Sequence, residues 1–220
     1  MVGYVVRRVN IIIVLCIVVS LFCWYEAQNV QSSLLFDYLA FSKGNILSGK
    51  VWTPVTALFV HGSPLHLVGN MIFLYVFGNT LEEELKSGKT LAAFFLGGIG
   101  SFLLSLFFYP PDTSMIGASA AIFTLTAVVM LIKPLKFSFF FLMPQGLVAI
   151  IYLVYNLAAV YFGIQGDVGY ISHIIGFLIG IPLGIMWSKK WKRNVAVTLA
   201  LLAFYLLIEI YLLPTVLQAI

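Results

Sequence analysis

Two side chains in this sequence have the chemistry needed for nucleophilic catalysis, and both lie within apolar segments. Ser119 lies in the tetrapeptide Gly-Ala-Ser-Ala, and His173 is one of only three histidines in 220 residues. A hydroxyl beside an imidazole can attack a carbonyl carbon, because the imidazole accepts the hydroxyl proton. In a membrane helix a serine can instead bond to its own helix, and a histidine can bind a carbonyl, a metal or haem.

The residues around Ser119 favour a reactive position. Residues 110–113, Pro-Pro-Asp-Thr, interrupt the apolar stretch, and we expect a new helix to begin near Ser114. Ser119 would then lie close to a helix amino terminus, where unpaired N–H groups and the macrodipole stabilise negative charge. Gly117 and the neighbouring alanines leave room for a substrate backbone to approach.

His173 is the natural general base. Its segment has a glycine at every fourth position from Gly176 to Gly184, a pattern that lets two helix axes approach closely. His173 lies one turn before Gly176 on this stripe. If the partner is the helix of Ser119, contact between Gly176 and Gly117 would bring the imidazole within hydrogen-bond reach of the hydroxyl.

The other histidines lie close together in the chain. His66 and Asn70 are four residues apart and so share one helix face, from which both can donate hydrogen bonds to an oxyanion or to a neighbouring helix. We expect His61, where a long loop meets this helix, to pin the loop. Neither Asp167 nor Glu209 is tied by sequence to the catalytic imidazole, so a two-residue Ser–His arrangement is the simpler interpretation.

Helical rise puts these groups at similar depths beneath one membrane surface. At about 1.5 Å per residue, Ser119 lies at most about 12 Å below the outer surface and His173 about 9 Å below it. His66 lies about 5 Å below that surface, with Asn70 one turn deeper. Because unrelated packing residues have no reason to agree in depth, a single site in the outer half of the protein is favoured.

The composition requires lipid around the elements that position these residues. The chain is 62% hydrophobic and only 9% charged, against about 25% charged residues in a soluble domain. Continuous apolar runs predict an all-α, polytopic bundle of membrane helices, forming one integral membrane domain over residues 1–220. The seven predicted segments are 9–25, 64–81, 90–109, 115–132, 137–162, 169–187 and 195–213. Pro144-Gln145-Gly146 interrupts the fifth.

The distribution of lysine and arginine predicts the orientation. With the amino terminus in the cytoplasm and the carboxyl terminus outside, ten basic residues lie inside and only Lys43 and Lys50 lie outside. The ten are Arg7, Arg8, Lys86, Lys89, Lys133, Lys136, Lys189, Lys190, Lys192 and Arg193. We expect a multi-pass protein of the cell (plasma) membrane. The outer loop 27–63 is expected to lie in the membrane interface as short amphipathic pieces. The scattered charge gives no sign of nucleic-acid binding.

Several motifs, in order, resemble the rhomboid family of intramembrane serine proteases. Residues 61–70, His-Gly-Ser-Pro-Leu-His-Leu-Val-Gly-Asn, resemble the family's histidine and asparagine signature. Residues 77–82 look like the end of the same span, residues 117–120 match its Gly-x-Ser-x motif, and residues 172–176 with Gly180 match the sixth core span. The resemblance covers residues 1–188 and makes 195–213 an additional seventh span.

The resemblance implies a reaction and the residues that perform it. It implies Ser119 as the nucleophile, His173 as the general base, and an oxyanion hole made by His66, Asn70 and the Ser119 backbone N–H, without a metal or cofactor. Transmembrane proteins would be cleaved near the outer side of the bilayer, with the fifth span and residues 163–168 as gate and cap. The substrate and the oligomeric state stay open.

Two positions depart from the family pattern. Trp52 is followed by Thr53 where the family often has arginine, which puts the anchoring of the loop in doubt. Phe123 replaces a common tyrosine, so it can stack on the imidazole but offers no hydroxyl. Neither departure affects Ser119 or His173.

Other functions fit part of the pattern. A transporter or channel would use polar membrane residues, although it should carry ionisable groups near the bilayer midplane, where this chain has almost none. A rhomboid-like protein could also bind membrane proteins without cleaving them. His66 and His173 could ligate haem or a metal, although the metalloprotease motif H-E-x-x-H is absent.

Overall fold

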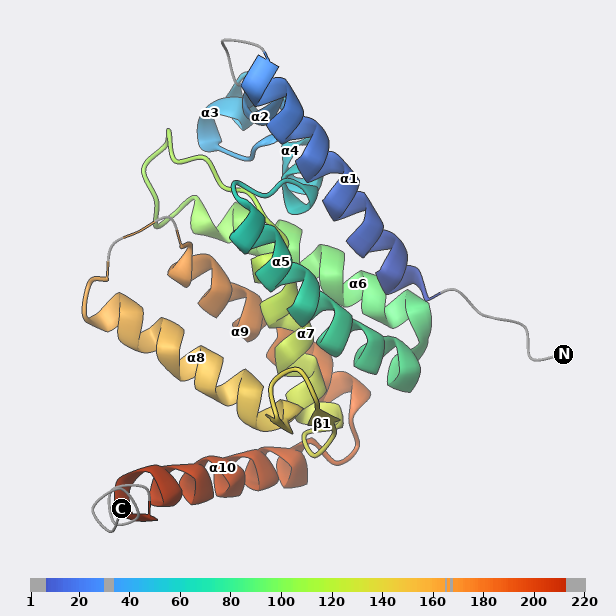
Figure 1. Ribbon diagram of the computed structural model, residues 1–220, viewed down its shortest axis with the longest axis vertical. Coiled ribbons are helices and arrows are strands. Elements are labelled where there is room, and N and C mark those ends of the chain that lie inside the picture. The colour runs from blue at the N-terminus through green and yellow to red at the C-terminus, as the bar shows by residue number, and fades with distance from the viewer. Residues whose placement is uncertain (1–6, 30–33, 165, 167, 213–220) are drawn as a thin grey trace, which may run out of the picture.

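The computed structural model describes residues 7–29, 34–164, 166 and 168–212. These residues form a helical bundle whose only strands are two residues long (Figure 1). In chain order the elements are α1 Arg8–Asn29, α2 Leu34–Leu39, α3 Lys43–Leu47, α4 Thr53–Thr56, η1 Ala57–Phe59, α5 Pro64–Phe73, η2 Leu74–Gly78, α6 Asn79–Ser105, α7 Ser119–Ile132, β1 Phe137–Ser138, β2 Met143–Pro144, α8 Gln145–Tyr161, α9 Tyr170–Trp187, α10 Trp191–Leu207 and η3 Ile208–Leu212.

Four stretches of described helix are long and apolar enough to cross a membrane, namely Arg8–Gln28, Pro64–Ser105, Tyr170–Trp187 and Trp191–Tyr211. The shorter apolar helices α7 and α8 lie with them in the bundle. The prediction of an all-α, multi-pass membrane protein is confirmed.

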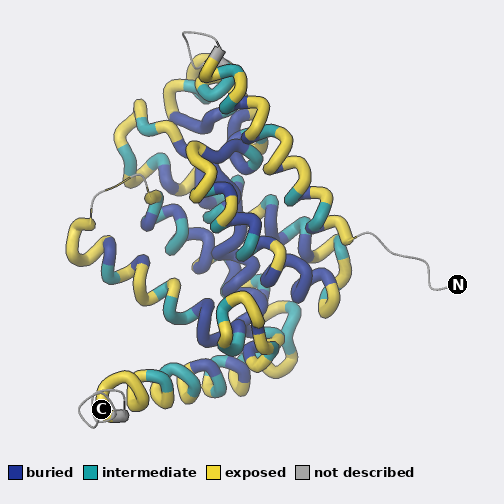
Figure 2. Tube along the Cα trace, in the orientation of Figure 1, coloured by how far each residue is buried: buried dark blue, intermediate teal, exposed yellow. Residues whose placement is uncertain are grey.

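Helix α7 is the centre of the bundle, and every residue from Ala120 to Leu131 is buried (Figure 2). It lies against α6 and α9, whose glycines allow close approach. A Cβ added to Gly97 of α6 would overlap the Thr124 side chain of α7, and one added to Gly176 of α9 would overlap the Ala120 carbonyl oxygen. Small residues therefore bring three helix backbones together, as expected where lipid provides no hydrophobic force between helices.

The segment from α5 to α6 contains two helices that meet at a kink. Ser63 caps α5, since its Oγ accepts the His66 N–H at 3.2 Å, and Pro64 occupies the first turn. The π-helical turn η2 continues α5 into the first residues of α6, and the chain then turns sharply at Lys86, with φ of 70°. The prediction of separate helices over 64–81 and 90–109 is therefore confirmed, although the first helix runs on to the kink.

The long loop folds as the short helices α2, α3 and α4 with the 3₁₀ turn η1, as expected for interfacial pieces (Figure 1). It is tied to the segment before α7 by paired backbone bonds between Phe41 and Met115, at 3.0 and 2.7 Å. The Trp52 indole N–H donates to the Tyr38 carbonyl at 3.0 Å. This bond joins two parts of the loop, so Trp52 stabilises the shape of the loop itself, although Thr53 follows it.

Two helices begin later than the sequence predicts. The segment expected to be helical from 115 contains helix only from Ser119, because Gly117 has a positive φ of 107°. The fifth segment, expected over 137–162, begins with the β1–β2 hairpin, in which Leu142 has φ of 54°, and α8 starts only at Gln145. The interruption at Pro144 thus separates a hairpin from the helix.

Helix α10 lies across the lower end of the bundle and projects beyond it (Figure 1). Its described residues are exposed or half-buried apart from Asn194 and Thr198 (Figure 2). Of the four long apolar stretches, the last is therefore the least buried. The Asn194 amide donates to the Leu131 and Ile132 carbonyls at 2.7 and 3.1 Å, so the start of α10 caps the end of α7.

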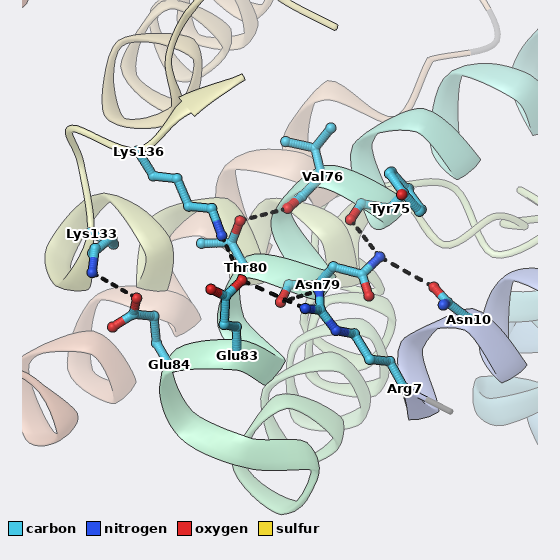
Figure 3. A network of polar contacts seen from close by, with 10 residues as sticks. All are labelled: Arg7, Asn10, Tyr75, Val76, Asn79, Thr80, Glu83, Glu84, Lys133 and Lys136. Atoms are coloured by element: carbon cyan, nitrogen blue, oxygen red, sulfur yellow. Dashed lines mark hydrogen bonds and ion pairs between the residues drawn. The ribbon is translucent and has the colours of Figure 1, made fainter. Parts of the chain in front are cut away.

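Charged residues join three chain segments at the end of the bundle where α1 begins (Figure 3). Glu83 lies 3.7 Å from Arg7 and 2.7 Å from Lys136, and Lys133 lies 2.8 Å from Glu84. These ion pairs are exposed and contribute about 0–1 kcal/mol each. Their neighbour Glu82 is buried and accepts the first N–H groups of α1, which fixes that helix against α6.

Candidate active site

The turn before α7 presents Ser119 at the first residue of a helix. The Gly117 N–H donates to the Ala57 carbonyl at 2.8 Å, and the Ala118 N–H donates to His61 Nε2 at 3.4 Å. With φ of 107°, Gly117 turns the chain into α7 in a conformation that L-residues rarely adopt. The predicted location of Ser119 near a helix amino terminus is confirmed, although the helix starts five residues later than expected.

Ser119 and His173 are in direct contact. His173 Nε2 lies 2.8 Å from Ser119 Oγ, so the predicted hydrogen-bond distance is present. The helix pair achieves it differently from the prediction, because the nearest atoms to a Cβ added at Gly176 belong to Ala120 and Ser101, whereas those nearest to a Cβ added at Gly117 belong to His66 and Asn70. Close approach of α9 to the first turn of α7 sets the distance between the two side chains.

Phe123 lies one turn after Ser119 on α7 and stacks on the His173 ring. The ring centroids are 4.6 Å apart and the ring planes differ by 7°. The expectation that phenylalanine can stack here is confirmed. Stacking restricts the tilt of the imidazole while leaving both ring nitrogens at its edge free to form hydrogen bonds.

A residue that the sequence analysis missed contacts the second nitrogen of the imidazole. Asn156 Oδ1 lies 2.8 Å from His173 Nδ1, where the sequence analysis expected no third group. Only acidic residues were considered as partners of the imidazole. The sequence feature that points to Asn156 is that it is the lone amide in the otherwise apolar and aromatic run from Leu147 to Tyr161.

His66 and Asn70 face the same point from α5. A Cβ added to Gly117 would lie 2.7 Å from His66 Nε2 and 3.5 Å from Asn70 Nδ2, so both polar groups border the turn that presents Ser119. Asn70 Nδ2 is buried and has no hydrogen-bond partner among the described residues. An unpaired buried donor is uncommon and is explained when a ligand atom occupies the space in front of it.

His61 joins α1, the loop and the start of α7. Its carbonyl accepts the Trp24 indole N–H at 2.8 Å, and its Nδ1 lies 3.1 Å from Ser20 Oγ. Because Nε2 accepts the Ala118 N–H, Nδ1 carries the proton and donates to Ser20, which donates onward to a carbonyl. Burial lowers the pKa of His61 to about 3, which keeps the ring neutral in this role.

A cavity of about 900 Å³ lies between α5, α7, α8 and α9, and His61 is not part of its lining. Its lining includes His66, Asn70, Ser119, Phe123, Asn156 and His173. Neither of the two acidic residues considered in the sequence analysis is among the described residues that line this cavity. Glu209 belongs to η3, beyond α10, where it bonds to Tyr205, and Asp167 is outside the described residues. In the described parts of the chain, no group of three or more His, Cys, Asp or Glu side chains is placed so that it could hold a metal ion.

Comparison with known proteins identifies the family. A sequence model of the Rhomboid domain matches residues 48–190, which include every side chain of the cavity named above. The protein belongs to the rhomboid family. The expected family membership is confirmed, and with it the rhomboid-like helical membrane fold.

Named relatives of this rhomboid come from plants, a protozoan and bacteria. Rhomboid-like protein 11, chloroplastic, of Arabidopsis thaliana is 30% identical over 61% of this chain and 52% of its own length. Rhomboid-like protease 3 of Toxoplasma gondii is 32% identical over 66% and 57%. Rhomboid protease GlpG of Yersinia enterocolitica is 26% identical over 81% and 62%. The chain thus spans between half and two thirds of the length of these relatives.

Proposed function

We propose that this protein is an intramembrane serine endopeptidase that hydrolyses a peptide bond in or near the transmembrane segment of membrane-protein substrates. The observation that carries the proposal is the 2.8 Å contact between Ser119 Oγ and His173 Nε2, in an open cavity between helices α5, α7, α8 and α9. The protease names of two relatives support the same reaction class.

The geometry supports a two-step acyl transfer. Ser119 Oγ attacks the substrate carbonyl carbon while its proton passes to His173 Nε2, and the carbonyl oxygen becomes an oxyanion. The unpaired Asn70 amide, His66 and the Ser119 backbone N–H are its proposed donors, aided by the amino terminus of α7. The tetrahedral intermediate then collapses and expels the amine, which takes the proton from His173. Water, deprotonated by the same imidazole, attacks the acyl carbon, and the bond to Ser119 Oγ breaks as His173 returns the proton to that oxygen, so the acid is released.

We propose further that the loop end of the bundle faces the outside and that the end bearing α10 faces the cytoplasm. The excess of basic residues at span ends supports this orientation, with the amino terminus inside. Residues 1–188 form the proposed core. The proposed additional span is 195–213, with the carboxyl terminus outside, and its residues up to 211 lie in Trp191–Tyr211, an apolar helix long enough to cross a membrane. The plasma membrane is the proposed location.

A fluorophosphonate probe tests the function, because it phosphonylates only an activated serine. We expect the protein purified in detergent to be labelled, and both Ser119→Ala and His173→Ala to abolish labelling. Ser138→Ala is the matched control, since Ser138 is also buried and its hydroxyl has no partner among the described residues. It should be labelled like the wild type.

Two results would contradict the proposal. Labelling that survives Ser119→Ala would place the nucleophile elsewhere. A wild-type protein that takes up no probe and cleaves no transmembrane reporter would favour a non-catalytic role, and a haem absorption spectrum would favour ligation by the histidines.

A further inference from the structure

The orientation of the Asn156 amide is determined by its own helix. Asn156 lies on α8, and its side chain is 2% exposed. Its Nδ2 donates to the Tyr152 carbonyl one turn earlier, at 2.7 Å. The reversed amide would set its oxygen against that carbonyl oxygen, which is repulsive. The amide oxygen is therefore the atom that faces His173.

This orientation determines which nitrogen of the imidazole carries the proton. Asn156 Oδ1 is only an acceptor, so His173 Nδ1, 2.8 Å away, must be the donor. A neutral imidazole has one N–H, which leaves a lone pair on Nε2. That lone pair points to Ser119 Oγ, also at 2.8 Å, and is the form that can accept the hydroxyl proton.

We propose that Asn156 is a positioning residue that holds His173 in the Nδ1–H tautomer, so that the site operates as a Ser–His–Asn chain spanning α7, α9 and α8. The proposal rests on the proposed protease function and adds a residue to it. It also gives Asn156 a second role during the reaction. Once Nε2 is protonated, the neutral amide oxygen continues to hold Nδ1–H and stabilises the imidazolium less than a carboxylate would.

The surroundings of the imidazole make the amide the main influence on the tautomer. From α7 the ring meets Ser119 and the uncharged Phe123. The titratable side chains that line the cavity with it are His66 of α5, Tyr109 before α7, Tyr152 and Tyr155 of α8 and Tyr170 of α9. No carboxylate is among the described lining residues, so none of them competes with the amide for Nδ1–H.

The test separates positioning from ordinary packing between helices. Asn156→Leu keeps the approximate volume and removes the acceptor, whereas Asn156→Asp keeps the acceptor and adds a charge. Asn194→Leu is the matched control: Asn194 is 1% exposed, and its amide also donates to backbone carbonyls, but at the far end of α7. Each variant is labelled with the fluorophosphonate probe across pH. The tautomer is read from ¹⁵N shifts of labelled histidine, with His173→Ala identifying the signals.

We expect wild-type His173 to give the Nδ1–H signature. Asn156→Leu should lose this signature and slow labelling about 10- to 100-fold, because the base is misoriented. Asn194→Leu should label within about twofold of wild type, because Asn194 lies far from the site and its loss should not affect the reactivity of Ser119. In Asn156→Asp the carboxylate stabilises the imidazolium, so the acid limb of the pH–rate profile should move up by about one unit or more.

The proposal is overturned if wild-type His173 carries its proton on Nε2, or if Asn156→Leu labels like Asn194→Leu. If Asn156→Leu does not fold, the pH profile of Asn156→Asp decides, and an unmoved acid limb overturns the proposal. Failure of the proposed function is a different result, because the wild type itself would then not be labelled.

Discussion

At the scale of single residues, the position of Gly117 requires both a positive φ and the absence of a Cβ, and only glycine meets both requirements. Its φ of 107° is strained for any L-residue, by about 1–3 kcal/mol. A Cβ there would also lie 2.7 Å from His66 Nε2, so that ring would have to move. We expect Gly117→Ala to lower the rate of fluorophosphonate labelling about 10- to 100-fold, because it disturbs a proposed oxyanion donor.

Gly88→Ala is the control for this substitution. Gly88 lies on α6, outside the lining of the cavity, and a Cβ added there meets nothing within 4 Å. It should leave labelling unchanged and stabilise the helix slightly. Equal rates for the wild type and Gly117→Ala would remove His66 from the proposed oxyanion hole.

His61 predicts a loss of stability in acid. Burial lowers its pKa from 6.5 to about 3, so the unfolded chain binds a proton more readily than the folded one. The stability that depends on neutral His61 is complete above pH 6.5 and is lost as the pH falls toward 3.

The measurement is thermal unfolding in detergent at pH 7.5 and at pH 4.5. Lowering the pH should reduce the Tm of the wild type more than that of His61→Gln, whose amide is neutral at both values. Both proteins retain His66 and His173, so the difference between them reports His61. An equal reduction in both proteins would contradict this assignment.

The sequence was most informative about which residues of the site share a helix face and which helices pack closely. The spacing of His66 and Asn70 indicated one helix face, and the glycine stripe indicated close packing beside His173. Asn156 was not predictable in the same way. Its helix pairs with α9 only through tertiary packing, and one amide in an apolar helix has many possible partners.

At the scale of elements, the approach of α9 to α7 controls the Ser119–His173 distance. A Cβ on Gly176 would overlap the Ala120 carbonyl, which is backbone and cannot rotate away. We expect Gly176→Ala to separate the helices, to cost about 1–3 kcal/mol of stability, and to lower labelling more than its loss of folded protein explains. Gly88→Ala of α6 is the control, because nothing lies within 4 Å of its added Cβ.

The measurements are labelling per folded molecule and the unfolding temperature. Full labelling by a destabilised Gly176→Ala would show that the dyad tolerates a wider helix spacing than we infer.

Hydrophobicity predicted the existence of the helices better than their ends. An apolar run has the same composition in a helix and in an extended segment, so it could not place the start of α7 at Ser119. That start depends on the positive φ of Gly117, and the start of α8 depends on the β1–β2 hairpin. The position of α10 could not be predicted for a related reason, because the side chains of an apolar helix can contact lipid as favourably as protein.

At the scale of the whole molecule, the orientation in the membrane can be tested with single cysteines. The chain's two cysteines, Cys16 and Cys23, are free and buried, so the wild type provides a background without labelling. Lys43 at the loop end and Lys189 before α10 are both exposed. On intact cells, a membrane-impermeant maleimide should label Lys43→Cys, whereas Lys189→Cys should react only after permeabilisation. The opposite pattern would invert the proposed topology.

The size of the cavity affects how water would reach the acyl-enzyme in the deacylation step of the proposed reaction. A volume of about 900 Å³ has room for about thirty waters at the density of the liquid. In the proposed reaction, release of the acyl group consumes one water per turnover, so this cavity, when filled with water, would hold the supply for many turnovers beside Ser119. Water in the cavity would then act as a local solvent phase in contact with the proposed acyl-enzyme. We therefore expect deacylation to be insensitive to how readily the surrounding bilayer lets water through.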